Sequence, residues 1–446
     1  MRENNLTQGN VKKLLLSFSL PFLAANLLQA LYGATDLFVV GMYNGTSAIS
    51  AVNIGSQLMQ IITSFVIGCS MGCTVLTGRH IGEANGGKSA SKTLGSTIIM
   101  FAIFAVIITP TVFLLARPMS LLMQTPPEAL AETAAYVAIC SLGIPFIIAF
   151  NVTAAVLRGI GDSKTPMMIV AVACAVNILG DLILTGFFDM GVVGVAIATS
   201  SAQLVSSVFG IIMTKKRKLP FSFNIKNIAF DKTEGINVIK VGLPIAMQDT
   251  LINISFIILT IIANLRGLVS SSAVGVVEKL IMFMFLIPSS MLSAISAFTA
   301  QNMGANKKDR AVSALKFGML ITAMFGMVMC AISWICPQVL TSIFSKDDAV
   351  ILAANEYLKT YSIDCILVAF TFCVNGYLCG CEKSFVTFIH NTISIFLVRI
   401  PMAYILSRAF ADTMLPMGLA SPLGSLASIA ILCIYFAIQS RKKKLN

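Results

Sequence analysis

The sequence predicts an all-α integral membrane protein, with twelve transmembrane helices in two parallel-repeat six-helix lobes around a central cavity. Three observations predict this class. Of the 446 residues, 57% are hydrophobic and only 11% are charged, whereas soluble domains are about 25% charged. Apolar runs of about 20 residues recur along the chain, each long enough to cross a ~30 Å hydrocarbon core as a helix. Motifs of the first half also return in the second.

The predicted helices are the apolar runs between polar, Gly or Pro breaks. The polar start with Lys12 and Lys13 leads directly into such a run and shows no signal-peptide pattern, so we expect the first helix to remain in the mature chain. The helices are expected near residues 14–40, 49–76, 94–116, 133–156, 166–188, 191–213, 236–264, 273–298, 313–336, 357–378, 385–407 and 416–439.

Basic residues are distributed unevenly among the predicted loops. The N-terminal segment and every second loop after it hold 24 of the 31 Lys and Arg residues. The opposite loops hold only Arg117, Arg266, Lys346, Lys359 and Arg408. Because cytoplasmic loops carry an excess of Lys and Arg, we expect a multi-pass protein of the plasma membrane with both termini in the cytoplasm. The net charge of +12 is then an orientation signal, and no nucleic-acid partner is expected.

The two halves repeat one design. The segments 77–82 (TGRHIG) and 299–304 (TAQNMG) are related by an offset of 222 in the numbering, and Ala51 and Ala273 share this offset. The offset is 223 for Pro21 and Pro244, and 221 for Leu157 and Leu378, after which Gly and Ser follow at matching positions. The expected domains are an N-terminal lobe, a cytoplasmic linker and a C-terminal lobe, at residues 1–213, 214–235 and 236–446. Six helices in each half make the repeats parallel, which is one of the two known designs of alternating-access transporters.

Two acids lie at membrane depth in the first half. Asp36 is near the outer end of the first predicted helix, and Asp181 is in the outer half of the fifth. Ionisable residues in a membrane are costly, and they are functional candidates by default. Two carboxylates close together in a low dielectric cannot both ionise cheaply, and a proton or a sodium ion relieves the repulsion equally well. Tyr32 and Asn177 each precede an acid by one turn and share its helix face. The alternative for Asp36 alone is a helix cap near headgroup water.

The second half offers four further ionisable residues within predicted helices, as substrate-binding or secondary charges. They are Asp249, Glu278, Asp364 and Arg399. Glu278 precedes Lys279, so it could also lie in the membrane interface. Arg399 is close to the Pro401 break, where an acid such as Asp364 is its expected partner. A structural role for these residues remains open at this stage.

Neither an enzyme nor a metal site is predicted. Most of the eleven Cys residues lie inside apolar runs, where Cys acts as a small apolar residue. The two His residues, His80 and His390, lie near predicted loops and far from any nucleophile or metal pattern, and no phosphate-binding loop is present. We therefore expect no cofactor, and transport that is not driven by ATP.

The chain resembles the multidrug and toxic compound extrusion (MATE) family over nearly its whole length. The resemblance is carried by Pro21, Asp36 and Gly41, by the loop 157–166 (LRGIGDSKTP), by Asn177 and Asp181, and by the segment 301–306 (QNMGAN). The prokaryotic branch that it resembles is the DinF-like one. That branch has a polar network for cation coupling in the N-terminal half. Carried over residue by residue, the network comprises Tyr32, Asp36, Asn151, Asn177, Asp181 and Thr199.

Two observations limit the resemblance. The predicted fourth helix places Asn151 toward its cytoplasmic end, deeper than the other members of the network. The NorM-type branch carries acids in helices seven and ten, where this chain has Ile252 and Val368. We therefore expect coupling through the N-terminal acids.

The function that the resemblance implies is a proton- or sodium-coupled antiporter that exports amphipathic, cationic organic compounds by alternating access, as a monomer. The alternative is a flippase for a lipid-linked oligosaccharide or related lipid, which would need basic residues in the membrane to hold a phosphate. Here only Lys279 and Arg399 lie in or beside predicted helices. A channel or scaffold is a third class, and it would tolerate neutralisation of both Asp36 and Asp181.

Overall fold

The computed structural model describes residues 5–84, 86–216, 219–221 and 228–445, the last four of them as backbone only. Residues 217–218 and 222–227 of the predicted linker lie outside the described residues, as does Arg2. The described chain is helical and contains no strand. The chain divides into two compact units. Unit 1 comprises Met1–Ala246 with Ala300–Lys307, and unit 2 comprises Met247–Thr299 with Lys308–Asn446. The predicted lobe boundaries stay a prediction.

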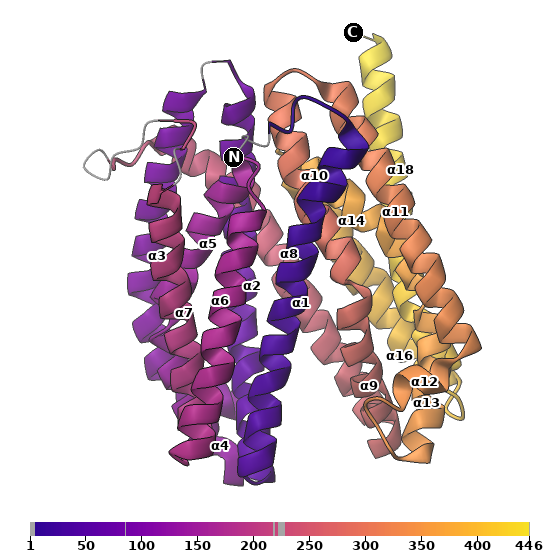
Figure 1. Cartoon of the computed structure of the whole chain (residues 1–446). Coiled ribbons are helices and arrows are strands. Elements are labelled where there is room, and N and C mark those ends of the chain that lie inside the picture. The colour runs from indigo at the N-terminus through magenta and orange to yellow at the C-terminus, as the bar shows by residue number, and fades with distance from the viewer. Residues whose placement is uncertain (1–4, 85, 217–218, 222–227, 446) are drawn as a thin grey trace. The chain divides into compact units, whose positions relative to one another are not determined.

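Unit 1 is built from helices that run along one another (Figure 1). The π-helical segment η1 directly continues α6. Unit 1 also includes the first turns of α8 and the end of α10. The elements are α1 (Val11–Tyr43), α2 (Thr46–Gly82), α3 (Gly87–Leu122), α4 (Pro127–Ser141), α5 (Ile144–Gly159), α6 (Lys164–Asp181), η1 (Leu182–Phe187), α7 (Gly191–Lys216), α8 (Lys232–Asn264) and α10 (Leu286–Gly304).

Unit 2 contains the remaining elements and a second π-helical segment, η3, between α15 and α16. It also holds most of α8 and α10. The further elements are α9 (Leu268–Met284), α11 (Lys308–Ile335), α12 (Pro337–Thr341), α13 (Asp348–Tyr361), α14 (Asp364–Gly380), α15 (Ser384–Ile393), η3 (Ser394–Arg399), α16 (Ile400–Ala409), α17 (Leu415–Gly418) and α18 (Ala420–Leu445).

The prediction of twelve spans is confirmed when bent helix pairs are counted as one. Nine helices in the described chain are long and apolar enough to cross a membrane alone, and three bent pairs bring the number to twelve. The pairs are α4 with α5, α9 with α10 and α13 with α14, bent by 47°, 41° and 48°. Sequence patterning missed these bends. Gly143 and Pro145 interrupt the first pair, because proline cannot donate the backbone hydrogen bond that an α-helix needs.

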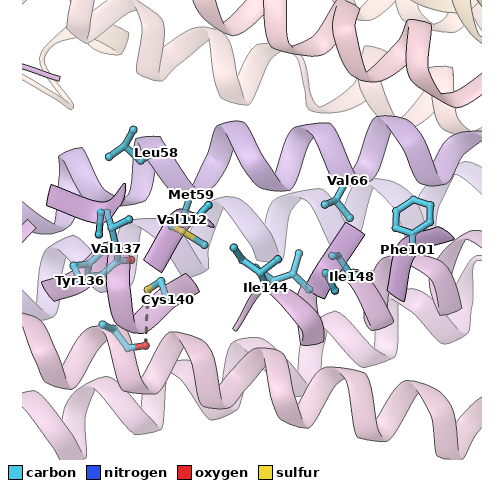
Figure 2. Packing of buried hydrophobic residues seen from close by; sticks show 14 of the residues in the cluster. Leu58, Met59, Val66, Phe101, Val112, Tyr136, Val137, Cys140, Ile144 and Ile148 are labelled. Carbon is cyan, nitrogen blue, oxygen red and sulfur yellow. Dashed lines mark hydrogen bonds between the residues drawn. The ribbon is translucent and has the colours of Figure 1, made fainter. Parts of the chain in front are cut away.

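Buried apolar side chains fill the space between α2, α3, α4 and α5 in unit 1. Figure 2 shows part of this cluster, with Leu58 and Met59 of α2 near Val137 of α4, and Val66 near Ile148 of α5. A separate cluster in unit 2 joins α9 to α13 and includes Val277, Leu280 and Tyr361. Each unit therefore has an apolar core of its own.

The end of α2 and the end of α10 approach each other closely within unit 1. A Cβ atom at Gly82 would overlap the backbone of Gln301, and one at Gly304 would overlap the backbone of Arg79. Gln301 Nε2 also donates to the carbonyl of Gly159 over 2.7 Å. Gly82 and Gly304 occupy matching positions of the two repeated segments, so the repeated motif places two equivalent glycines where two backbones meet.

Candidate cation-binding site

The two predicted acids are brought together by α1 and α6, which pack against each other. Asp36 lies on α1 and is 3% exposed, and Asp181 is the last residue of α6 and is 0% exposed. The two carboxyl groups lie close enough to interact electrostatically. Helix α1 ends at Tyr43 and the span of α6 ends at Phe187. At ~1.5 Å per residue, the acids lie about 10 Å and about 9 Å from these ends. They are therefore at equal depth, and Asp36 is deeper than its sequence predicted.

Helix α7 contributes a third polar residue, Thr199. Its Oγ1 donates to Asp36 Oδ2 over 3.4 Å and accepts from Asn177 Nδ2 over 3.5 Å. The amide of Asn177, which is fully buried one turn before Asp181, also lies near Asp36. Both distances exceed the usual length of about 3 Å for such contacts, so these bonds are weak.

The acids have too few donors for their burial. Within the described residues, neither oxygen of Asp181 has a hydrogen-bond partner, and Asp36 Oδ1 and Asn177 Oδ1 have none. A buried polar atom without a partner is costly, and a buried charge without one is more so. Four acceptor oxygens therefore share one region without a matching donor. A proton or a small cation with a preference for oxygen ligands would satisfy them.

Tyr32 joins this group and Asn151 does not. The hydroxyl of Tyr32 lies near Thr199 and Gln203, one turn of α1 before Asp36. Asn151 is buried on α5, but its Nδ2 donates to the carbonyl of Ile147 in its own helix over 2.8 Å. The structure thus groups Tyr32, Asp36, Asn177, Asp181 and Thr199, whereas the predicted sixth member is bonded elsewhere. The bend between α4 and α5 is the feature that the predicted straight helix lacked.

Sequence reasoning missed two residues of α4 beside this group. Tyr136 is 2% exposed, and its hydroxyl is 3.2 Å from Ser56 Oγ on α2. Cys140, one turn later, has its Sγ within 3.9 Å of the carbonyl oxygen of Ala196, the contact drawn as a dashed line in Figure 2. Both side chains interact electrostatically with Asp36. Their spacing of four residues on one helix face was the available signal.

Unit 2 gathers three of its four predicted charges. Arg399 Nη1 donates to Ser255 Oγ over 3.2 Å, Nη2 donates to the hydroxyl of Tyr361 over 3.3 Å, and the guanidinium stacks on Phe256 at 4.6 Å. Glu278 and Asp364 both interact electrostatically with Arg399. However, the described residues contain no ion pair of Arg399 within 4.0 Å. The expected direct pairing with Asp364 is therefore wrong: the bonds of Arg399 go to neutral hydroxyls.

Asp249 lies apart from that group. It is on α8, and its carboxyl group interacts electrostatically with the thiol of Cys379. Its oxygens take part in no hydrogen bond that the described residues show. Asp249 therefore belongs neither to the acid pair of unit 1 nor to the group around Arg399.

The two His residues are bonded more fully than their places near predicted loops indicated. His390 is fully buried, with Nε2 2.8 Å from Asn375 Oδ1 and Nδ1 2.9 Å from Ser428 Oγ. His80 lies between Glu83 and Glu234, at 3.0 Å and 3.2 Å. In the described chain, no three His, Cys, Asp or Glu side chains are placed to hold a metal ion.

A charged cluster at the start of α8 surrounds His80. Thr93 Oγ1 donates to Glu234 Oε2 over 2.8 Å, and Lys92 Nζ is 2.9 Å from Asp231 Oδ2. The Lys92 ammonium holds the pKa of Asp231 below its ordinary value, and the backbone N–H groups that Asp231 caps at the start of α8 act in the same direction. This cluster, which we call the α8 anchor (His80, Glu83, Lys92, Thr93, Asp231 and Glu234), fastens α8 to α2 and α3.

Together, these features define a multi-span membrane protein made of two repeated halves, with a buried acid pair in the first. The MatE family model matches residues 21–183 and again residues 244–405. The chain therefore belongs to the MatE family, which confirms the resemblance read from its sequence.

Curated relatives match over nearly the whole chain. The probable multidrug resistance protein YoeA of Bacillus subtilis is 25% identical over 439 residues, covering 96% of this chain and 94% of its own. The multidrug export protein MepA of Staphylococcus aureus strain NCTC 8325 is 26% identical, covering 82% of this chain and 81% of its own.

Solved structures match the fold. One is a crystal structure of MATE in complex with MaL6, with a TM-score of 0.92, 20% identity and coverage of 99% of this chain and 100% of its own. Another is the outward-facing conformation of a multidrug resistance MATE family transporter, with a TM-score of 0.90, 21% identity and 99% coverage of both chains. At this identity the likeness shows the fold alone.

Proposed function

We propose that the chain exports amphipathic, cationic organic compounds in exchange for protons or sodium ions, by alternating access. The observation that carries this proposal is the acid pair of unit 1, where Asp181 is buried beside Asp36 without a donor for either of its oxygens. The names of the relatives, which are multidrug resistance and export proteins, support the class of substrate.

The acid pair would act as the site where the coupling cation binds. Two adjacent carboxylates repel each other in a low dielectric, and a bound proton or sodium ion removes that repulsion. Thr199 and Asn177 tie the pair to α7 and α6. Uptake of a cation would draw α1, α6 and α7 together, and its release would let them separate. Coupling requires that the cation binds the two access states with different affinity, because otherwise it shifts no equilibrium.

The setting follows from the same reasoning. We propose that the protein lies in the plasma membrane with both termini in the cytoplasm, since basic residues concentrate in alternate loops. We also propose a monomer, which the resemblance to MATE proteins implies. The flippase alternative needs a basic site in the membrane. Arg399, however, already bonds to Ser255 and Tyr361, and the relatives compared are named as multidrug proteins.

The test is efflux of ethidium from cells sensitive to drugs, or the equivalent movement in inverted vesicles, under an imposed proton or sodium gradient. Asp36→Asn and Asp181→Asn are compared with the wild type at equal expression. The control is Asp309→Asn, which removes an exposed acid in the first turn of α11. We expect the wild type and the control to export with one of the two gradients, and both site variants to lose the response.

Two results would contradict the proposal. If the wild type moves no organic cation under either gradient, the substrate class is wrong. If the Asn variants still respond to the gradient, the acid pair does not couple transport.

A further inference from the structure

Unit 2 contains a polar group at the positions that correspond to the unit 1 site. The family model matches residues 21–183 and 244–405. The offset between the two halves is 223 at Pro21 and Pro244, where the matches start, and we take the ends of the two matches as equivalent, which gives an offset of 222 there. Between these points, the starts of α4 and α13, at Pro127 and Asp348, are related by an offset of 221, and both helices are followed by bends of nearly equal angle. These offsets allow positions to be compared one by one.

The comparison shows an exchange of charges. The equivalents of Asp36 and Asp181 are Leu259 and Ala403, which are both buried in the apolar cluster of unit 2. The equivalent of Asn177 is Arg399. Unit 2 thus lacks both acids of the unit 1 site and has a permanent positive charge where unit 1 has an amide.

The neighbours of Arg399 are the equivalents of residues around the unit 1 acids. Ser255, which accepts from Arg399, corresponds to Tyr32, and Tyr361 corresponds to Cys140. Tyr357 corresponds to Tyr136, and Glu278 corresponds to Ser56, which contacts Tyr136 in unit 1. The same positions therefore converge in both units, with a cation built into the second.

The π-helical segment η3 explains how Arg399 reaches this position. The offset between the halves is 221 at Ser163 and Ser384, and with the ends of the two family matches taken as equivalent it becomes 222, which places one additional residue of unit 2 in this interval. Residues 394–399 form the π-helical turn in the same interval, and a π turn accommodates one residue more than an α turn. Arg399 is its last residue.

The charges that face Arg399 come from several elements. Glu278 on α9 accepts from Thr260 over 3.2 Å, and Asp364 on α14 is 4% exposed with Oδ1 unpaired among the described residues. Tyr357 and Tyr361 of α13 also interact electrostatically with the guanidinium. From α8 and α18, the neighbours are uncharged. Among the described residues, Arg399 is the cation that interacts electrostatically with both acids, so the two acids outnumber the positive charge that they share.

We infer that Arg399 supplies, as a fixed part of unit 2, the positive charge that the equivalent site of unit 1 takes up as an exchangeable cation. Unit 2 then always carries a positive charge at this place, as unit 1 does only when a cation is bound. Ion exchange is therefore confined to unit 1. This rests on the proposed function only in its reference to unit 1. The role of Arg399 itself follows from the repeat and from its contacts.

The experiment measures thermal stability of the purified full-length protein in detergent, with sodium chloride against choline chloride and at acidic against neutral pH. It uses a background of Asp36→Asn with Asp181→Asn, in which the unit 1 site is silent. We expect Tm of this background to be insensitive to sodium, and its own response to pH, to which groups outside the site such as His80 contribute, serves as the baseline. Adding Arg399→Asn, the residue of unit 1, should make sodium or acid raise Tm by about 2 to 4 °C, because the acids then need an external cation.

Two further variants separate charge from packing. Arg399→Lys keeps the charge and should remain insensitive to the cation. Adding Glu278→Gln and Asp364→Asn to the Arg399→Asn variant removes the acids and should abolish the shift. If Arg399→Asn alone does not fold, this last combination should restore folding, since no uncompensated acids remain.

Three results would overturn the inference. They are a folded Arg399→Asn variant whose Tm does not respond to sodium or pH, a failure to fold that neutral acids do not rescue, and a cation response of the background that disappears with Glu278→Gln and Asp364→Asn while Arg399 is intact. The assay contains no substrate and no gradient. A failure of the proposed export would therefore appear in the efflux experiment and leave this result unaffected.

Discussion

Unit 1 contains two polar clusters, and they are bonded in opposite ways. In the α8 anchor, Glu234 accepts from Thr93 and faces His80, which also contacts Glu83, and Asp231 is paired with Lys92. In the buried acid pair, both oxygens of Asp181 lack a partner among the described residues. Full bonding is what a structural cluster needs, because every lost bond costs stability. A site that must bind and release an ion needs the opposite, since saturated acids would have no affinity for a cation.

The largest expected effect comes from Asp181→Asn. We expect gradient-driven efflux to fall by at least about tenfold, because the proposed site loses one of its two acids. The free energy of unfolding should stay equal or rise by about 1 kcal/mol, because a buried carboxylate without a hydrogen-bond partner is removed. Efflux assays and melting curves of the same preparation measure the two effects. A variant that loses efflux only because it melts at lower temperature would place Asp181 with the structural residues.

Gly82→Ala should produce the largest loss of stability. The added Cβ meets the backbone of Gln301, which cannot move aside as a flexible side chain would, so the cost is about 1 to 3 kcal/mol or more. Gly275→Ala is the matched control, because no atom lies within 4 Å of its Cβ position. We expect this control to be neutral or slightly stabilising in its helix. Equal melting temperatures of the two variants would mean that the α2–α10 contact is loose.

Glu234→Ala should cost about 1 to 3 kcal/mol, because it removes the acceptor of Thr93 and one partner of His80. Efflux per folded molecule is expected to stay unchanged, since the α8 anchor binds no ion in the proposed mechanism. Glu83→Gln serves as a comparison: Glu83 is half-exposed, and its loss should cost less than about 1 kcal/mol. If Glu234→Ala changed the ion dependence of transport, the α8 anchor would take part in ion coupling and would not be a purely structural cluster.

The smallest effect is expected from Asp231 and depends on pH. Because the pKa of Asp231 is lowered by Lys92 and by the capped N–H groups, its contribution is present above the pKa of the unfolded chain, about 3.9. It is lost as the pH falls through the lower pKa of the folded state. Asp231→Asn should therefore melt below the wild type at neutral pH, and the two curves should converge in strong acid. A difference that grows with acidity would contradict this assignment.

The sequence could predict the spans and the acid pair, and the reasons are physical. Long apolar runs and the excess of basic residues depend on composition alone, and Asp36 and Asp181 stand out because acids are rare in such runs. Gly143 and Pro145 cause the bend after Ser141, but its angle depends on how α4 and α5 pack, so the sequence could not place Tyr136 and Asn151 relative to the acids. The neighbours of Arg399 were likewise beyond reach, because a π-helical turn decides which way its side chain points.

The π-helical turn η3 also bears on how such proteins diverge after a gene duplication. Each residue of an α-helix advances by about 100° around the axis, so an inserted residue would turn every later side chain to a new direction unless a π turn absorbs it, as η3 does. If the two halves began alike, an insertion absorbed in this way, together with a substitution, left an arginine where the other half has an amide and kept the later positions in register. A small change in the gene would thus let one copy stop exchanging ions while the other kept doing so.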